Sequence, residues 1–330
     1  MAGPHTSPSI PVIDVAGLVA GEDDLVAARE IDAACRDTGF FLISGHGVPM
    51  RLLNQMEAAS VNFFNQSRTR KAEVAMEHGG AAWRGWFPLG GELTSGVPDG
   101  KEGFYVGLDH PDDHPRVVEG TPLHGPNLFP ADPAAFGRSI RAWMDAAIPV
   151  AASVMRGIAM GLGLPPTWFA DHLTADPTVL FRVFHYPPDP TFTWGVAEHT
   201  DYGLLTLLAH DGTPGLQVRS NDEWIEVPAD RELIVCNIGD MLDRLTEGRY
   251  RSTPHRVKNT SDRARFSFPL FYDPSWDAQV VPLPLDGSPP ADDAGTRWDG
   301  ASVQAWDGTY GDYLTAKVAK VFPELFGSVG

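Results

Sequence analysis

The chain has 330 residues, of which 43% are hydrophobic, and it carries a formal net charge of −18. This length and composition suit a globular protein with a sizeable core. The acidic excess argues against nucleic acid or an anionic membrane as a partner, and two cysteines cannot form a disulfide framework. The sequence shows neither a signal-peptide pattern nor an apolar run that could span a bilayer, so we expect a cytoplasmic protein.

Helices are predicted at both ends of the chain and in its middle. Apolar residues recur at helical spacing in four segments, which are residues 25–37, 52–64, 139–164 and 307–326. Two other segments are expected to be irregular. Residues 83–107 are rich in glycine and aromatic residues, and residues 284–299 are rich in proline and aspartate.

Short strands separated by turn signals are predicted from Val179 onward. They cover residues 179–186, 204–209, 216–219, 224–227, 233–238, 255–258, 265–272 and 280–283. About eight strands in this arrangement are typical of a double-stranded β-helix, or jelly roll. The predicted fold is therefore mixed α/β, with a mainly β core and helical decoration at the N- and C-terminal ends.

Two histidines and one aspartate form the most informative pattern in the sequence. His199 and Asp201 are two positions apart, so on a strand their side chains leave the same face. His255 comes much later, in another predicted strand. Two His and one carboxylate can occupy one face of an octahedral metal and leave the other positions open, which is the ligand set of non-haem Fe(II) oxygenases. Zinc also accepts these ligands, so the three residues alone leave the metal open.

A second pair follows this predicted metal site. Arg265 and Ser267 are also two apart, so they project to one face of the predicted strand. There the arginine can bind a carboxylate through two parallel hydrogen bonds, and the serine can add a hydroxyl donor. This R-x-S pair indicates a site for a bound carboxylate.

With these motifs in this order, the chain resembles the isopenicillin N synthase-like family of 2-oxoglutarate/Fe(II)-dependent dioxygenases. Further matching segments are spread over nearly the whole chain, at residues 10–14, 39–48, 101–102 with Gly107, 186–188, 215–218, 237–240 and 255–257. The resemblance implies four regions. They are an N-terminal dioxygenase region (1–125), a connecting helical region (126–175), a jelly-roll catalytic core (176–285), and a loop with a C-terminal helix that packs on the core (286–330).

The resemblance also implies roles for individual residues. His199, Asp201 and His255 would be the catalytic Fe(II) ligands, and 2-oxoglutarate would chelate the iron. Arg265, helped by Ser267 and the Tyr186 hydroxyl, would bind the distal carboxylate of 2-oxoglutarate. With O2, the enzyme would produce succinate and CO2 while it hydroxylates, desaturates or cyclises a small substrate. The chain departs from several plant members at Phe184, where they carry an asparagine two residues before this tyrosine.

Substrate contacts can be assigned only through segments that border the active-site mouth in relatives. On that basis the candidates are Trp83, Arg84, Trp86, Phe104 and Trp194, although such large side chains also fill protein cores. Arg84 and Lys101 either hold a substrate carboxylate or pair with Glu92 and Glu102, and we favour pairing. The substrate is expected to be a small natural product or amino-acid-like molecule.

Three functions are compatible with the sequence. We favour a 2-oxoglutarate-dependent oxygenase. Oxidases of the same fold that do not consume 2-oxoglutarate, such as isopenicillin N synthase and aminocyclopropane carboxylate oxidase, also carry R-x-S. A non-catalytic jelly-roll binding protein is the third. His185 is expected to be structural because it faces away from Tyr186 on a strand, and Asn237 and Asp240 are interpreted as turn and packing residues.

Overall fold

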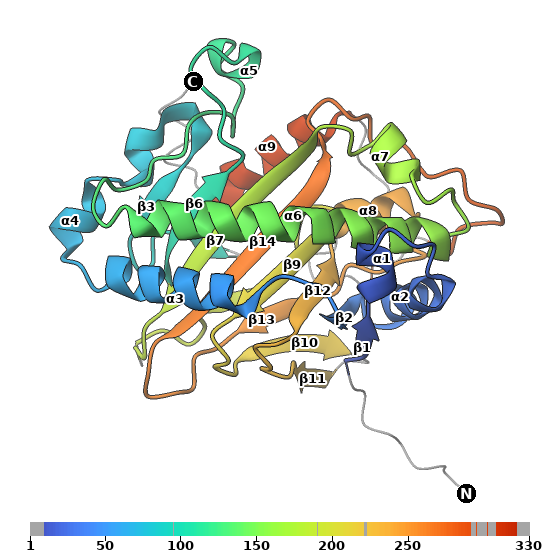
Figure 1. Ribbon diagram of the computed structural model, residues 1–330, viewed down its shortest axis with the longest axis horizontal. Coiled ribbons are helices and arrows are strands. Elements are labelled where there is room, and N and C mark those ends of the chain that lie inside the picture. Colours follow the sequence, from blue (N-terminus) through green and yellow to red (C-terminus); the bar gives the residue numbers. More distant parts are fainter. Residues whose placement is uncertain are drawn as a thin grey trace, which may run out of the picture.

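The computed structural model describes residues 10–94, 96–189, 191–220, 223–291, 295, 302 and 308–321. Most of its strands belong to two sheets that face each other across the centre of the molecule, with helices around the larger one (Figure 1). This is the jelly-roll core with helical decoration that the sequence predicts.

The larger sheet has eight strands. In spatial order they are β1 (Val12–Asp14), β2 (Phe40–Ser44), β12 (Ile234–Ile238), β9 (Leu205–His210), β14 (Arg265–Ser275), β7 (Pro177–Tyr186), β6 (Glu102–Gly107) and β3 (Gly85–Phe87). The β1–β2 pair is parallel and the other neighbours are antiparallel. Each end of this sheet therefore comes from the N-terminal part of the chain, while its centre comes from the second half.

The smaller sheet has four strands, in the order β11 (Glu223–Glu226), β10 (Leu216–Ser220), β13 (His255–Val257) and β8 (Val196–His199). Its neighbours are antiparallel. Apolar side chains from β10, β13 and β8 pack against β2 and β12 of the larger sheet. This second, smaller core holds the two sheets together.

The segment over residues 83–107 corrects the prediction of an irregular region. It contains β3, β6 and the small hairpin β4 (Leu93–Thr94) and β5 (Val97–Pro98). The side chains of β3 and β6 are buried throughout. The prediction was wrong because fully buried strands lack the alternation of polar and apolar residues that marks a half-buried strand.

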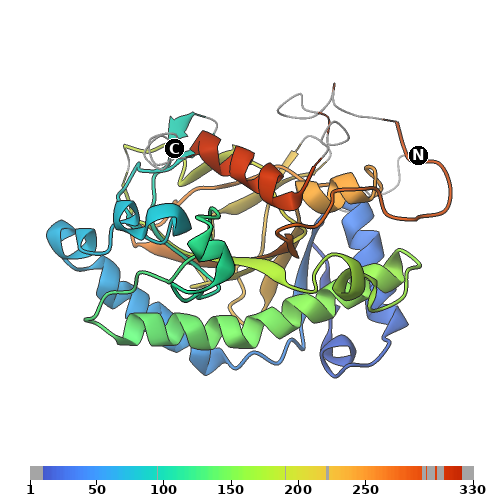
Figure 2. The ribbon, with the colours of Figure 1, turned by 90° about the horizontal axis from the view of Figure 1, so that it is seen from above.

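Helices cover the outer face of the larger sheet. The helical elements are α1 (Ala16–Val19), α2 (Leu25–Asp37), α3 (Met50–Phe64), α4 (Arg68–Ala72), the 3-10 helix η1 (Met76–Ala82), α5 (Pro115–Val118), α6 (Ala135–Gly161), α7 (Trp168–His172), α8 (Asp240–Leu245) and α9 (Tyr310–Val321). Helix α2 starts where the sequence predicts because the Asp24 carboxylate accepts hydrogen bonds from the free backbone N–H groups of Val26 and Ala27. Helix α6 crosses the outer face of the sheet, whereas α9 lies on the opposite face of the sheet (Figure 2).

Two predictions near the C-terminus have mixed outcomes. Residues 280–283 do not form a strand, and the nearest pairing is a single bridge between Gln279 and Thr309. The predicted helix over residues 307–326 is confirmed over Tyr310–Val321, while Asp307 and residues 322–326 lie outside the described part of the chain. Of the predicted loop over residues 284–299, residues 292–294 and 296–299 also lie outside it. Among the helices that the structure describes, none combines the length and the apolar character needed to cross a membrane.

Alternation along two central strands opens a cavity between the sheets. On β7, residues 180, 182, 184 and 186 line this cavity, and on β14 residues 265, 267, 269, 271 and 273 do so. Successive side chains of a strand point to opposite faces. The intervening residues therefore face the helices, where Phe181, Val183, Phe266 and Phe268 join the main hydrophobic core. One face of β7 and β14 therefore lines the cavity, and the other face packs in the main hydrophobic core.

Candidate active site

The structure brings His199, Asp201 and His255 together at one wall of the cavity. Their ligand atoms all lie within 4.8 Å of one another. The Asp201 Oδ1 atom is 3.9 Å from Nε2 of His199 and 3.7 Å from Nε2 of His255. The two histidines are directly opposite each other in the antiparallel β8–β13 pair. Strand β8 ends at His199, so Asp201 reaches the site from the turn that follows.

Both histidines are fixed so that Nε2 is left for a metal. The Nδ1–H group of His199 donates to the Ala197 carbonyl at 2.8 Å, and that of His255 donates to the Thr253 carbonyl at 3.2 Å. Such backbone hydrogen bonds set the tautomer and orientation of metal-binding imidazoles. Burial lowers the pKa of both rings, that of His255 to about 4. The rings are therefore neutral near pH 7, as metal ligation requires.

Asp201 is held by two residues that sequence reasoning did not assign to the site. Its Oδ2 atom accepts hydrogen bonds from Thr206 Oγ1 at 2.6 Å and from Asn237 Nδ2 at 2.8 Å. Burial by itself would raise the pKa of Asp201, but the two histidines and these two donors hold it below its usual value. Oδ1 is therefore free to face the histidines as an ionised ligand. Asn237 is a site residue, which corrects its interpretation as a turn and packing residue.

The second predicted motif, Arg265 and Ser267, lines the same cavity. Arg265 is 2% exposed, and its Nε–H donates to the Thr213 carbonyl at 3.2 Å. Its Nη1 is buried without a hydrogen-bond partner. The Tyr186 and Ser267 hydroxyls are 3.2 Å apart, and the Arg265 guanidinium lies 5.0 Å from the Tyr186 ring centroid. A buried guanidinium with an unmatched donor requires an acceptor. The carboxylate of a bound molecule would supply it, so these three residues fit one end of 2-oxoglutarate.

The cavity has a volume of about 460 Å³, within the range of roughly 300–1,000 Å³ that is usual for small-molecule sites. Lining residues come from both sheets, from the β4–β5 hairpin and from helix α9, which contributes Leu314, Lys317 and Val318. Lys317 is anchored by Asp240, whose Oδ2 lies 3.3 Å from its Nζ. Asp240 therefore positions one wall of the cavity, in line with its interpretation as a packing residue.

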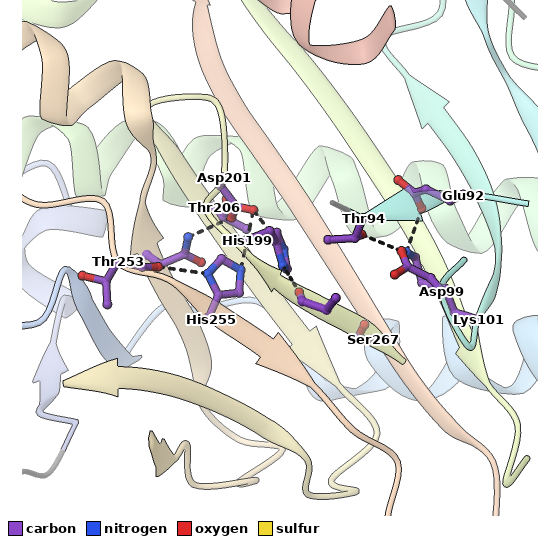
Figure 3. A network of polar contacts seen from close by, with 12 residues as sticks. Glu92, Thr94, Asp99, Lys101, His199, Asp201, Thr206, Thr253, His255 and Ser267 are labelled. Atoms are coloured by element: carbon purple, nitrogen blue, oxygen red, sulfur yellow. Dashed lines mark hydrogen bonds and ion pairs between the residues drawn. The ribbon is translucent and has the colours of Figure 1, made fainter. Parts of the chain in front are cut away.

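A buried ion cluster forms another wall (Figure 3). The Lys101 ammonium is paired with the Asp99 carboxylate and lies 2.8 Å from Oε2 of Glu92. Thr94 donates to Asp99 at 2.7 Å, and the Tyr105 hydroxyl donates to Glu92. Burial would lower the pKa of Lys101 and raise that of Glu92. The attraction between the two opposite charges reverses both shifts, so both groups are ionised.

The predicted substrate residues do not line this cavity. Trp83, Trp86 and Phe104 are buried in the main core on the helical side. Arg84 is buried too and donates to the Leu123 carbonyl at 2.7 Å. Trp194 stacks on the Arg256 guanidinium, 4.2 Å from the ring centroid. The lining of this cavity therefore gives no support to substrate contacts by these five residues, and their role stays a prediction. The placement of Trp86 and Phe104 follows from the pairing of β3 with β6, which directs both side chains into the core.

The predicted ion pairs are partly confirmed. Lys101 pairs with Glu92, whereas Glu102 pairs with Lys71 at 2.7 Å. His185 is structural, as expected. It contacts Glu102 at 2.9 Å and stacks on Phe266, on the face of β7 away from the cavity.

Comparison with known proteins identifies the family of this site. Residues 177–274 match the model of the 2OG-Fe(II) oxygenase superfamily, and residues 10–132 match the N-terminal region described as that of a non-haem dioxygenase in morphine synthesis. The match over residues 177–274 contains His199, Asp201 and His255, which we call the triad, and also the R-x-S pair.

Curated relatives span nearly the whole chain. A probable iron/ascorbate oxidoreductase of Dictyostelium discoideum is 41% identical, with 98% of each chain covered. A homoarginine-6-hydroxylase of Glycine max is 35% identical over 96% of this chain and 98% of its own length. A 1-aminocyclopropane-1-carboxylate oxidase of Dictyostelium mucoroides is 32% identical over 96% of this chain and 95% of its own.

Solved structures share the fold. One is the crystal structure of a full-length Neurospora crassa protein in complex with alpha-KG and 5-formyluracil, which is 25% identical with a TM-score of 0.74. The match covers 94% of this chain and 96% of that one.

Proposed function

Because the chain belongs to the 2-oxoglutarate/Fe(II)-dependent dioxygenases, whose members use Fe(II), 2-oxoglutarate and O2, we propose that it couples oxidative decarboxylation of 2-oxoglutarate to oxidation of a small organic substrate. The observation that carries this proposal is the buried, unmatched Nη1 of Arg265 in the cavity that holds the His199–Asp201–His255 triad. A carboxylate acceptor and a metal-binding triad in one cavity suit a co-substrate that bridges them.

In this proposal each residue has a defined task. His199, Asp201 and His255 hold Fe(II), with the aspartate oriented by Thr206 and Asn237. Arg265 binds the distal carboxylate of 2-oxoglutarate, and the Ser267 and Tyr186 hydroxyls complete that end of the site. When bound, the iron and 2-oxoglutarate together supply the oxidising chemistry with O2. The protein positions the substrate C–H group and excludes water.

The reaction outcome proposed is hydroxylation, with desaturation and cyclisation as outcomes that the same site allows. The substrate is small because the cavity of about 460 Å³ must also accommodate the co-substrate. Two of the relatives described above are named for amino acids, which are homoarginine and aminocyclopropane carboxylate. We propose an amino-acid-like substrate on that basis.

The 32% identity to an aminocyclopropane carboxylate oxidase supports one alternative. Such an oxidase would oxidise its own substrate without consuming 2-oxoglutarate. Here Arg265 would bind the carboxylate of a different molecule.

Succinate release tests the proposal. The Fe(II)-loaded protein is supplied with 2-oxoglutarate and O2, and succinate is measured with and without a panel of small substrates. Substrate-stimulated succinate formation, absent without 2-oxoglutarate, is expected. Oxidation of a substrate at an undiminished rate without 2-oxoglutarate would favour the oxidase alternative.

A further inference from the structure

The ion cluster on the cavity wall contains more charge than a structural link requires. Glu92, Asp99 and Lys101 bring two carboxylates and one ammonium into a region where Lys101 is 1% exposed. Each buried ion loses its hydration, and an apolar contact of similar volume often stabilises a fold as well or better. The cluster does attach the β4–β5 hairpin to the sheet, since Thr94 bonds Asp99. Attaching the hairpin does not explain why both charged groups of the Glu92–Lys101 pair line a cavity.

Glu92 and Lys101 themselves line the cavity, whereas Asp99 stands behind them. Other side chains of the protein hold both residues in place. Asp99 pairs with Lys101, and Tyr105 donates to Oε1 of Glu92. Lys101 donates a hydrogen bond to Asp99, and its ammonium lies 2.8 Å from Oε2 of Glu92, a buried atom that has no hydrogen-bond partner within the described part of the chain. The pair is therefore rigid and presents one negative and one positive group to whatever occupies the cavity.

The charge on this wall is balanced by a fourth residue. The Arg182 guanidinium also lines the cavity and stacks on the Tyr105 ring, 3.4 Å from its centroid. Two carboxylates thus face one ammonium and one guanidinium. A ligand with a single net charge would leave an unbalanced buried charge, which is costly. An uncharged ligand avoids this cost, and so does a zwitterion, which can in addition pair with both Glu92 and Lys101 on the cavity wall.

We infer that the Glu92–Lys101 pair binds the zwitterionic head of an α-amino acid, with its ammonium on Glu92 and its carboxylate on Lys101. This inference rests on the proposed function and names the residues that would bind the head of its amino-acid-like substrate. The 2.8 Å contact between Lys101 Nζ and Glu92 Oε2 is similar to the spacing of the two charged groups in an amino-acid head. An amino acid bound in this orientation would form two ion pairs, so that positive and negative groups alternate among its own two charges and those of Glu92 and Lys101. The amino-acid side chain then extends into the rest of the cavity that contains the triad.

The first test uses the unaltered protein and modified ligands. Binding to Mn(II)-loaded protein with 2-oxoglutarate is measured by anaerobic calorimetry. The ligands are the common L-amino acids, L-homoarginine and 1-aminocyclopropane-1-carboxylate. For each binder, the N-acetyl derivative removes the positive charge and the carboxamide removes the negative one. Either change should weaken binding by at least about tenfold, because it leaves one charge of the pair buried and unmatched. Derivatives that bind within about threefold of the parent amino acid would overturn the inference.

The second test changes the pair and includes a matched control. Glu92→Gln keeps the shape of the side chain and an acceptor for Tyr105 but removes its charge. Glu102→Gln makes the same change in another buried Lys–Glu pair that does not line the cavity. Glu92→Gln should weaken amino-acid binding by at least about tenfold and leave 2-oxoglutarate binding unchanged. Glu102→Gln should change neither. Equal weakening in both variants would assign the effect to stability and overturn the inference.

Succinate release separates this inference from the proposed function. Amino acids that bind through Glu92 without any succinate formation would overturn the proposed function and leave the inference standing. Succinate formation stimulated only by uncharged molecules, such as thymine, would overturn the inference together with the amino-acid-like substrate, and would leave the proposed coupling to 2-oxoglutarate standing.

Discussion

Asn237 Nδ2 donates a 2.8 Å hydrogen bond to Oδ2 of Asp201, while Oδ1 of the same carboxylate faces the two histidines. Oδ2 is thereby held by residues of the larger sheet, and Oδ1 stays available to a metal. The arrangement depends on sheet register, because Asn237 of β12 is paired with Thr206 of β9, which supplies the second donor to Asp201.

Asn237→Ala is expected to weaken metal binding by about 10- to 100-fold, because partners that orient a ligand are typically worth that much. The dissociation constant for Mn(II) or Fe(II) checks this anaerobically. Asn127→Ala is the matched control, since Asn127 makes two hydrogen bonds to the Gly107 backbone outside the cavity. An unchanged metal affinity in Asn237→Ala would remove the asparagine from the metal site.

Asp201→Ala is expected to abolish turnover and to weaken metal binding further, because the only carboxylate of the triad is lost. Glu198→Gln serves as the control. Glu198 is next to the triad in sequence, but it does not line the cavity and contacts Arg219 at 3.2 Å. Retention of turnover by Asp201→Ala, measured as succinate release, would refute the metal assignment.

Arg265→Ala is expected to raise the 2-oxoglutarate concentration needed for half-maximal rate by at least about 30-fold. Truncating one partner of a buried charge pair costs about 2–5 kcal/mol. Arg84→Ala removes another buried guanidinium that does not line the cavity, and it controls for lost stability. Steady-state kinetics with varied 2-oxoglutarate checks the difference. Equal requirements in the two variants would refute the role of Arg265.

Asp273 gives a prediction for the pH dependence of stability. Burial raises the pKa of its carboxyl to about 7, although the Tyr310 hydroxyl and the Leu204 N–H donate to it. The unfolded value is near 4. Between these values the folded state binds the extra proton, so the free energy of unfolding falls as pH rises from about 4 to 7.

Asp273→Asn lacks this titration. Its stability relative to the unaltered protein should therefore increase with pH over that window, by up to about 4 kcal/mol. Urea unfolding at several pH values measures the difference. Asp112→Asn, at an exposed position, is the control. A difference that does not vary with pH would show that Asp273 is ionised in the folded protein throughout.

The parts of the site that sequence could predict are those encoded by short spacing. Arg265 and Ser267 are two residues apart on β14, and strand periodicity alone places both on one side. His199 and Asp201 have the same spacing, but β8 ends at His199, so the turn after the strand brings Asp201 to the site. Asn237 could not be found in this way, because no local pattern links it to Asp201. Their contact exists only through the pairing of β9 with β12.

The predicted substrate residues lie away from the cavity for a related reason. Trp86 and Phe104 are directly paired across β3 and β6, and both side chains point into the core. Lys101, immediately before β6, lines the cavity instead. The resemblance to relatives identified a segment that contributes to the cavity wall, but which side chains face the cavity depends on sheet pairings that the sequence pattern did not reveal.

The central claim is that one cavity holds both Fe(II) and 2-oxoglutarate, and an anaerobic titration tests it most directly. Fe(II)-loaded protein is titrated with 2-oxoglutarate while the visible absorption of an iron-chelated oxoacid is followed. The account predicts a saturable band in the unaltered protein that needs much more 2-oxoglutarate in Arg265→Ala. Iron bound in full with no band at any 2-oxoglutarate concentration would contradict it.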